Sequence, residues 1–473
     1  MTTVENSNVA ASAQNLRDIQ KLIGVEFNLK DQGKTWYPCS ATLTKILPDP
    51  LDGMMPELAI VAAARTSFLG TSSRLDKDKR LFQYLYKHEH VSPFEMSEIV
   101  FRLKNVQWGY MTDLLEDPRW KATLVRMDSW HDIYIKMDLN NILAYLKIVP
   151  FDEENTIQCF FRHVIEIAYP WTAELLGYKP SNIVDYSSTQ EPVNRVMMKD
   201  GEGDRWIERH DCSTSDEELA EFIYNYFSDS ETIEKVNSDG DEEYETIITH
   251  ELAEDSTTEE RIEYMFEKGD LRPLSLFSIK FLMKAPVLVL WQLVRHRSAS
   301  FNLQSGRYTA FKEDDLYLPD TWRKQSESNK QGSSDEVLSD MDFNDLRDGL
   351  TIEGDSLIRE FFIDITESKV NGDHADFSTM LNHYYQLGHT IYQAMLDQGA
   401  AKEQARLFLP AWASLYTAVI KFDLMFFLRF LRLRMAKDAQ LEIRQYANVM
   451  YLLFSEIMPL TASIASSHAF KGS

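Results

Sequence analysis

Cysteine is scarce in this sequence, and no hydrophobic run is long enough to cross a bilayer. The 473 residues contain three cysteines, Cys39, Cys159 and Cys212, which lie far apart. This odd, scattered set is typical of reduced thiols in a cytoplasm, and it predicts neither a disulfide framework nor a metal site. No secretory signal or transmembrane segment is predicted, so we expect a cytoplasmic protein without a membrane partner.

Basic residues are also few. The 49 Lys and Arg residues face 74 Asp and Glu residues, and the formal net charge is -25 at pH 7. A charge of this sign argues against nucleic-acid binding through a general basic surface. An anionic ligand would therefore need a local pocket of cationic residues. The length and the 44% of hydrophobic residues predict two or more domains with sizeable cores.

One local concentration of cations is the stretch LVRHRSASFNLQSGRY, from Leu293 to Tyr308. Arg295, His296 and Arg297 stand together in it, and Arg307 follows after several polar residues. The apolar run KAPVLVLWQLV leads into the stretch and is long enough to be buried. Because arginine offers oxyanions a planar fork of donors, the pattern predicts a pocket for a phosphate or another anion. A basic patch at the end of a buried helix fits the charges equally well.

The spacing of this stretch resembles the signature of the flavin-dependent thymidylate synthases, in which Arg-His-Arg precedes a serine by seven intervening residues; here that serine is Ser305. Other positions also hold residues that are usual in the family: Ser300, Asn302, Gly306, Arg307 and Tyr308. Leu303 departs from the pattern, because the family usually has Glu or Gln there, and Gln304 stands one place later. Met425 and Asp438 are further departures, which leave the flavin-binding mode open.

The resemblance implies a mixed α/β (α+β) fold and tetramers in which several subunits share each active site, with FAD as the bound cofactor. The implied reaction is the reductive methylation of dUMP at C5 to give dTMP. Methylenetetrahydrofolate would be the carbon donor and NADPH the reductant of the flavin. In such an enzyme the cofactor carries the difficult chemistry, and the protein supplies orientation and electrostatics.

On the nucleotide side, the resemblance assigns dUMP contacts to six residues: Gln292, Arg295, Ser305, Gly306, Arg307 and Arg406. Arg434, in FLRLR, matches the arginine thought to polarise the uracil, so we expect it to bind dUMP and to act in catalysis. A phosphate dianion needs at least one bidentate cation, and a developing enolate needs a fixed positive charge. Arg429 and Arg432 lie close to Arg434 in the sequence, and one or two of the three are expected to be solvated charges at a helix end.

On the flavin side, the block KHEHVSPFE matches a family block whose polar residues lie near the flavin and the folate. The matching residues are His90, Ser92 and Glu95. The other residues assigned to FAD are Arg295, His296, Arg297, Asn302, Asp138 and Asn140. A structural reading, in which His90 and Glu95 only cap and brace a turn, remains open.

The chain also repeats itself. The segment RIEYMFEKGDLRPLSLFSIKFLMKAP, from Arg261, aligns at a constant offset of 180 residues with the segment that begins at Leu81. AVIKFDLMFFLRFLRL, from Ala418, aligns with IYIKMDLNNILAYLKI, from Ile133, at an offset of 285. The two offsets differ by 105 residues, which the first copy would lack, and we expect the missing piece to be the one that carries Arg-His-Arg. Chance similarity between amphipathic segments is the alternative.

The repeats predict four parts of the chain. These are a polar N-terminal arm with some helical content (1–45), a degenerate first copy (46–181), an acidic linker or insertion (182–258) and a second copy with the Arg-His-Arg motif (259–473). In the second copy the positions of the flavin block hold Asp270, Arg272 and Ser275. We therefore expect composite sites with the flavin between the copies, and a homodimer that forms a pseudo-tetramer.

Local patterns add a few elements. The segment Glu57 to Phe68 reads as a buried strand or the start of a helix, and EIVFRLK alternates like a strand. The segments Asp216 to Phe227 and Leu441 to Met458 read as helices, and residues 324–340 look like a flexible loop.

Two other functions remain open from the sequence. One is a variant of the same fold that hydroxymethylates dUMP, and the other is a non-catalytic nucleotide-binding paralogue. The retained arginines Arg295, Arg406 and Arg434 favour catalysis, because a scaffold would need none of them.

Overall fold

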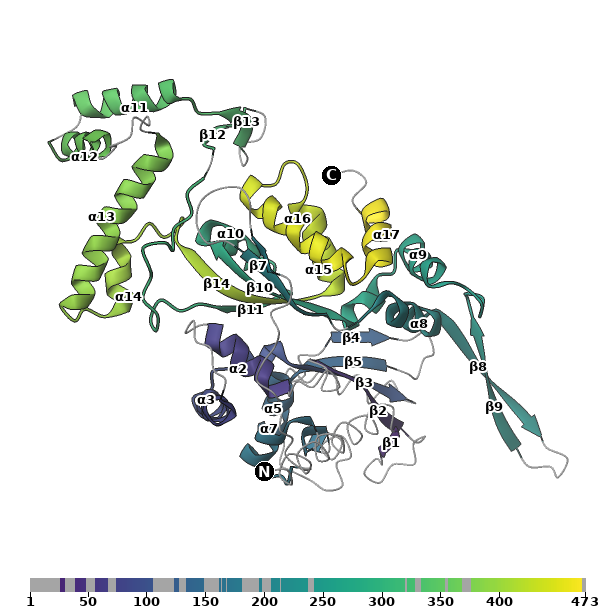
Figure 1. Cartoon of the computed structure of the whole chain (residues 1–473). Coiled ribbons are helices and arrows are strands. Elements are labelled where there is room, and N and C mark those ends of the chain that lie inside the picture. The colour runs from purple at the N-terminus through teal and green to yellow at the C-terminus, as the bar shows by residue number, and fades with distance from the viewer. Residues whose placement is uncertain are drawn as a thin grey trace, which may run out of the picture.

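A computed structural model describes most of the chain. It covers residues 26–29, 39–47, 56–66, 74–104, 123–126, 133–148, 161–162, 164–166, 168–180, 195–197, 206–212, 214–236, 242–319, 321–327, 333–353, 356–367 and 376–469. Two five-stranded sheets form the body, two two-stranded ribbons accompany them, and helices cover the sheets (Figure 1). This mixture of helices and strands confirms the predicted fold class.

The N-terminal sheet has the strand order β1-β2-β3-β5-β4, with antiparallel neighbours throughout. Its strands are β1 (Glu26–Leu29), β2 (Cys39–Leu47), β3 (Glu98–Lys104), β4 (Thr123–Arg126) and β5 (Ile133–Asp138). Its helices are α2 (Pro56–Thr66), α3 (Leu75–Lys87), the 3-10 turn η2 (Ser92–Met96), α5 (Leu139–Ile148) and α7 (Pro170–Leu175). The alternating segment EIVFRLK is β3, as predicted.

The C-terminal sheet has the order β11-β14-β10-β7-β6, again with antiparallel neighbours. Its strands are β6 (Arg195–Met197), β7 (Trp206–Cys212), β10 (Ser278–Pro286), β11 (Ser300–Leu303) and β14 (Leu415–Asp423). Its helices are α8 (Asp216–Tyr226), α9 (Thr258–Lys268), the turn η3 (Arg272–Leu276), α10 (Val287–Leu293), α15 (Leu424–Arg434), α16 (Leu441–Ser455) and α17 (Pro459–Ala469).

The two sheets follow the same plan. The order β1-β2-β3-β5-β4 corresponds strand by strand to β6-β7-β10-β14-β11. The turns η2 and η3 lie 180 residues apart, and the helices α5 and α15 begin 285 residues apart. Helices α3 and α9 are each followed by a left-handed residue at the offset of 180, Glu89 with φ 54° and Gly269 with φ 70°. These correspondences support the proposed tandem duplication.

The position of the extra residues differs from the expectation. Strand β4 occupies the same place in the N-terminal sheet as β11 in the C-terminal sheet. The counterpart of the Arg-His-Arg turn, which precedes β11, therefore falls within residues 105–122, and these lie outside the described residues. The long connection is 304–414, from β11 to β14, and its counterpart is 127–132. The expectation that the missing piece carries Arg-His-Arg is therefore wrong, because offsets between two matched blocks do not locate the insertion between them.

The long connection forms an extension beside the body (Figure 1). It contains β12 (Arg323–Gln325), β13 (Ser333–Val337), α11 (Asp340–Glu353), α12 (Ser356–Glu367), α13 (Phe377–Asp397), α14 (Lys402–Ala405) and the turn η4 (Arg406–Phe408). Strands β12 and β13 pair antiparallel within the segment expected to be a flexible loop. The polar side chains of this segment gave no alternating pattern, so the ribbon was not predicted.

Two segments expected to lie outside the copies contribute strands to the sheets. Residues 26–29 and 39–47, in or next to the predicted arm, form β1 and β2, and β2 pairs with β3. The acidic segment 182–258 contains β6 and β7 and the predicted helix α8, together with the ribbon β8 (Ser228–Val236) and β9 (Glu242–His250), which projects from the body (Figure 1). Backbone pairing of β2 with β3 and of β7 with β10 joins these strands to the sheets, and it does not require an apolar sequence.

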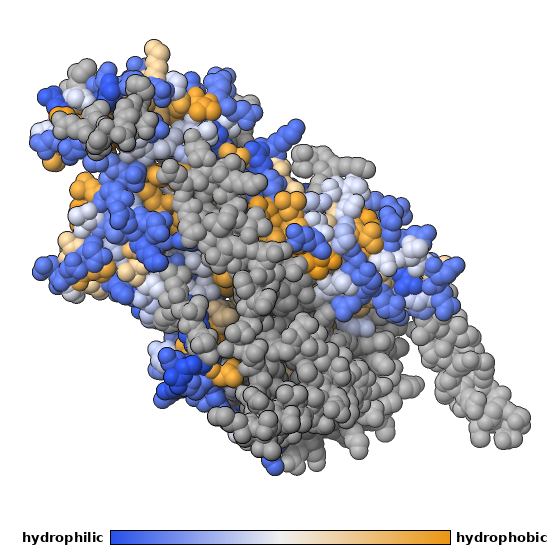
Figure 2. All heavy atoms as spheres, viewed as in Figure 1, coloured by the Kyte–Doolittle hydropathy of each residue, from blue (hydrophilic) through white to orange (hydrophobic). Residues whose placement is uncertain are grey.

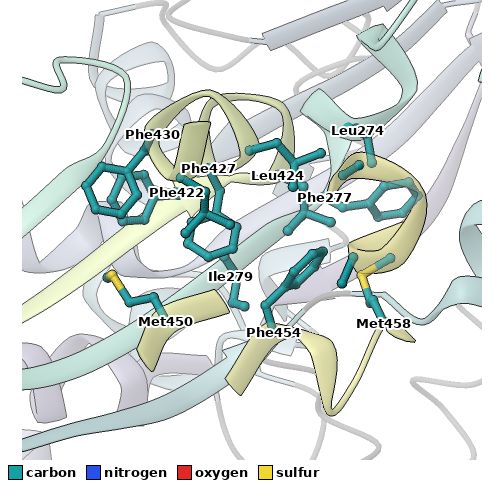
Figure 3. Packing of buried hydrophobic residues seen from close by; sticks show 14 of the residues in the cluster. Leu274, Phe277, Ile279, Phe422, Leu424, Phe427, Phe430, Met450, Phe454 and Met458 are labelled. Carbon is teal, nitrogen blue, oxygen red and sulfur yellow. The ribbon is translucent and has the colours of Figure 1, made fainter. Parts of the chain in front are cut away.

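The largest hydrophobic cluster lies between the C-terminal sheet and the helices α15 and α16 (Figure 3). Phe422 of β14 and Phe427 of α15 have ring centroids 5.6 Å apart, and Phe427 and Phe454 of α16 are 5.4 Å apart at 78°. Aromatic pairs of this kind add about 0.5–1.5 kcal/mol beyond their burial. The cluster fixes α15, whose last residue is Arg434.

Each unit closes with a helix whose N-terminus is capped by a buried acidic side chain. In the N-terminal unit, Glu57 Oε1 accepts hydrogen bonds from Trp171 N and Thr172 N, at 3.0 and 3.1 Å. In the C-terminal unit, the Asp216 carboxylate accepts from Leu460 N and Thr461 N, at 2.7 and 3.0 Å. An acidic side chain at this position satisfies N–H groups that the helix leaves without partners.

The two units pack against each other through their 3-10 turns. Turn η2 lies against β11, and turn η3 lies against β4. Helix α2 also contacts β11 and β14. Among the described helices, none has the length and apolar character needed to cross a membrane.

Candidate active site

The Arg-His-Arg turn follows a short buried helix. Strand β10 ends at Pro286, which precedes the first residue of α10, and Val289, Leu290 and Leu293 bury that helix. The turn then leads directly into β11, so its position is fixed at both ends. The side chains of Arg295 and Arg297 are exposed there, as an anion-binding role requires.

His296 joins this turn to the end of α15. Arg434 Nε donates to His296 Nε2 at 3.2 Å, and the imidazole packs edge-on against Phe430 at 5.1 Å. Burial, followed by the charges of Arg434 and Arg429, lowers the pKa of His296 to about 4. The ring is therefore neutral near pH 7 and accepts the hydrogen bond. Burial and the neighbouring Arg295 lower the pKa of Arg434, which still remains a cation.

The other end of the stretch contacts an arginine from the extension. A Cβ on Gly306 would lie 3.0 Å from Arg406 Nη1 and 2.8 Å from Phe311 Cε2, so glycine is needed for the close approach. Lys402 Nζ donates to Tyr308 O at 2.8 Å, which also holds η4 and α14 against the stretch. Arg307 pairs with Glu403 at 3.2 Å, with both side chains largely exposed.

A polar relay that the sequence did not reveal reaches Gln292. Gln292 Nε2 donates to Gln440 Oε1 at 2.5 Å, and Gln440 Nε2 donates to Glu442 Oε2 at 2.8 Å. Arg323 of β12 forms an ion pair with Glu442 at 2.8 Å, and both side chains are mostly buried. The relay links α10, α16 and the extension. The sequence indicated only one part of this relay, the helix predicted at Leu441 to Met458, and none of its side-chain contacts.

The residues assigned to the flavin lie on both units. Turn η2 carries Ser92 and Glu95 and packs against β11, which carries Asn302, so these assigned residues lie on elements that touch within one chain. A flavin site between the units stays a prediction. Ser92 and His90 are exposed, and the His90 ring stacks with Tyr84 at 6.0 Å. Exposed guanidinium and hydroxyl groups fit a diphosphate-containing cofactor, because they donate to oxyanions.

Two further residues assigned to FAD lie at the start of α5. Asp138 Oδ1 accepts from Asn141 N at 2.8 Å and so acts as the cap of this helix, while Asn140 is half-buried in its first turn. Asp423 caps α15 in the same way, through Phe426 N at 2.9 Å. The cap is a structural role for Asp138, and its contact with FAD stays a prediction.

The departures from the family pattern also have structural roles. Leu303 and Met425 pack against the largest hydrophobic cluster. Gln304 extends the pairing of β11 with β14, because Gln304 N donates to Thr417 O at 2.7 Å and Thr417 N donates to Gln304 Oε1 at 3.0 Å. Asp438 is exposed in the turn after α15.

The comparisons with known proteins point to one family. The model of the thymidylate synthase complementing protein family matches residues 213–460. A flavin-dependent thymidylate synthase of Kosmotoga olearia is 34% identical over 221 residues, which are 46% of this chain and 81% of that protein. One of Thermus thermophilus is 32% identical over 212 residues, 45% of this chain and 64% of that protein. One of Aquifex aeolicus is 24% identical over 391 residues, 82% of this chain and 90% of that protein.

The fold and the matched region define the class. The chain belongs to the thymidylate synthase complementing protein family, which confirms the resemblance found in the Arg-His-Arg stretch. The match spans less than two thirds of the Thermus protein, at 64% of its length.

Proposed function

We propose that this protein is a flavin-dependent thymidylate synthase. It would convert dUMP to dTMP with methylenetetrahydrofolate as carbon donor, NADPH as reductant and FAD as bound cofactor. The observation that carries the proposal is that both ends of the Arg-His-Arg stretch contact an arginine from a distant element. His296 contacts Arg434, and Gly306 lies against Arg406. Two separated guanidiniums suit a ligand with a phosphate at one end and a polarisable ring at the other.

Each arginine has its own role in the proposal. Arg406 and Arg295 bind the phosphate end of dUMP, together with the Ser305–Arg307 turn. Arg434 stands beside the uracil and stabilises the negative charge that develops when C5 becomes nucleophilic. The neutral His296 orients Arg434 through its Nε2 atom, which accepts the guanidinium hydrogen bond.

FAD would lie between the units. Arg295, Arg297 and Asn302 would hold it from the C-terminal unit, and His90, Ser92 and Glu95 would hold it from the N-terminal unit. Bound FAD supplies the redox chemistry and the transfer of the carbon unit, and the residues of this chain hold and orient the reactants.

The proposal is tested by product analysis. The purified protein is incubated with dUMP, methylenetetrahydrofolate, FAD and NADPH, and each component is omitted in turn. We expect dTMP only in the complete mixture, and a flavin absorbance spectrum in the purified protein. A colourless protein that gains no flavin and forms no product would favour the non-catalytic paralogue.

A second product is favoured by one observation. Leu303 and Met425, which pack into the core, stand where the family usually has polar residues near the flavin. Such changes leave room for hydroxymethylation of dUMP. The mass of the product decides between the two, because the hydroxymethyl product is heavier by one oxygen atom.

The assembly belongs to the same proposal. Two chains, each with two related units, would form a pseudo-tetramer. Helix α13 and the neighbouring turn η4 offer an apolar face, seen as orange patches over α13 and α14 in Figure 2. Its exposed apolar residues are Tyr384, Leu387, Ile391, Leu407 and Phe408. A second copy of the chain would cover this face. The cytoplasmic location stays a prediction.

A further inference from the structure

The two units meet at two related junctions. At the first junction, η2 of the N-terminal unit lies against β11 of the C-terminal unit. At the second junction, η3 of the C-terminal unit lies against β4 of the N-terminal unit. Since η2 corresponds to η3 and β4 to β11, an approximate two-fold axis relates the junctions. A symmetric pair would offer two equivalent flavin sites per chain.

Polar contacts hold the first junction. Lys421 of β14 forms an ion pair with Glu98 at 2.9 Å, where the side chains are 9% and 3% exposed. Lys280 of β10 is also buried, and its Nζ donates to Met96 O at 3.3 Å. Both lysines come from the C-terminal sheet. Lys280 holds Met96, the last residue of η2, and Lys421 holds Glu98, the first residue of β3. Directional contacts at so little exposure fix the turn, because breaking one leaves a buried charge without its partner.

The corresponding residues hold the second junction differently. Lys136, the counterpart of Lys421, reaches the hydroxyl of Ser278 at 3.3 Å, and Ser278 is the counterpart of Glu98. Val100, the counterpart of Lys280, packs into the largest hydrophobic cluster. Glu98 also interacts with Ser278 and Lys136, so this one carboxylate interacts with residues of both junctions. Glu98 belongs to β3, the strand that follows η2.

The turn η3 is also closed by an ion pair. Asp270 and Arg272 occupy the positions of His90 and Ser92, and Arg272 Nε donates to Asp270 Oδ1 at 2.7 Å. Tyr226 Oη donates to the same carboxylate at 3.0 Å. The groups that would face a ligand at the second junction are therefore engaged with each other, whereas Ser92 and His90 are exposed at the first.

We propose that Lys280 and Lys421 are positioning residues that hold the Ser92–Met96 turn for a single flavin at the first junction, and that the second junction binds none. This inference rests on the proposed function. It predicts a stoichiometry of one FAD per chain, and it assigns a function to two buried lysines that do not belong to the family signature.

The test compares the two lysines of the first junction with another, largely buried lysine in the full-length protein. Lys421→Met and Lys280→Met keep the side-chain volume and remove the ammonium group. Lys284→Met is the matched control, because it removes a largely buried ammonium group from the same strand, β10, and the partner of that group, Asp315 at 2.9 Å, belongs to neither junction. FAD affinity and stoichiometry are measured by flavin fluorescence titration. Hydrogen exchange of the peptide that covers residues 88–97 is measured without any cofactor, and thermal unfolding shows that each variant is folded.

We expect one FAD per wild-type chain, weaker FAD binding in Lys421→Met and Lys280→Met, and faster exchange in residues 88–97. If the turn is in place only about a tenth of the time, the apparent Kd rises roughly tenfold. Lys284→Met should leave both readouts unchanged. Two FAD per chain would overturn the assignment of the second junction, and equal affinity and exchange in wild type and Lys421→Met would overturn the positioning role alone.

Failure of the proposed function gives a different result. A wild-type protein that binds no FAD overturns that function and the flavin assignment together. Exchange of residues 88–97 then still decides whether the two lysines hold the turn, because that readout needs no cofactor. If Lys421→Met does not fold, the positioning role is tested with Lys280→Met instead.

Discussion

At the scale of single residues, two arginines carry separable parts of the proposed chemistry. Arg434 acts on a charge that develops in the transition state, and loss of one such donor costs about 2.7–4 kcal/mol, or roughly a hundred- to a thousandfold in rate. Arg434→Ala should therefore lower kcat by that factor while the protein keeps its flavin. Release of tritium from C5-labelled dUMP, measured beside flavin absorbance, checks this.

Arg406→Ala should act on affinity instead. A phosphate contact is made equally in the ground and transition states, so its loss raises KM for dUMP and leaves kcat nearly unchanged.

A turnover of Arg434→Ala close to that of the wild type would contradict the proposed role of Arg434. The residue would then serve only as a partner for His296.

His296 gives a pH-dependent prediction. Its pKa of about 4 in the folded state lies below the ordinary value of 6.5, so the unfolded chain takes up the proton first as pH falls. This residue therefore contributes stability that is fully present above about pH 6.5 and is lost as pH falls towards 4. We expect His296→Gln to lose less stability than the wild type over this range, as measured by urea unfolding at a series of pH values.

The same substitution separates orientation from charge. Gln keeps an acceptor for Arg434 Nε, whereas His296→Leu removes it. We expect His296→Leu to lower kcat by about ten- to a hundredfold, because a misplaced group costs rate at this scale, and His296→Gln to restore most of it. Equal rates in the two variants would show that the hydrogen bond does not position Arg434.

At the scale of elements, the cap of α7 has a titratable group of its own. Burial raises the pKa of Glu57 to about 8, against the opposing effect of the N–H groups of Thr172 and Trp171. The folded state therefore binds the proton more tightly than the unfolded one. Its stabilising effect is present below the ordinary pKa of 4.5 and is lost as pH rises through about 8.

Glu57→Gln should remove this dependence. Gln keeps the acceptor at Oε1 and cannot ionise, so we expect its melting temperature to exceed that of the wild type at pH 8 and above and to approach it at pH 5. Thermal unfolding followed by circular dichroism at both pH values is the measurement. Parallel melting curves at all pH values would mean that Glu57 is already ionised in the folded protein.

At the scale of the whole molecule, the exposed face of α13 and η4 predicts association. We expect sedimentation at micromolar concentration to give twice the chain mass of 54.9 kDa. Leu387→Glu places a charge on this face and should release monomers, because a charge is costly to bury without a partner. Gln393→Glu adds the same charge elsewhere on the exposed surface of α13 and is the matched control. An active monomer of the wild type would contradict the pseudo-tetramer.

Much of the molecule could be predicted from local patterns. The sequence predicted the helices at Asp216 to Phe227 and Leu441 to Met458 and the strand β3, because side-chain periodicity reports which face of an element is buried. The stretch from Leu293 to Tyr308 was enough to find the family, since its specified residues are neighbours in the chain. The internal repeat followed from two constant offsets, which require no knowledge of contacts.

The contacts that complete the site were decided by the tertiary structure. Gly306 and Arg406, Gln292 and Gln440, and Lys421 and Glu98 are partners that lie about 100, 148 and 323 residues apart. One sequence gives no signal for which lysine meets which carboxylate, because that choice depends on strand register and on how two sheets pack. The same packing places β4 against η3, and it shows that the extra residues follow β11. Pairing with the whole sheet fixes the place of a short strand such as β4, which its own residues do not specify.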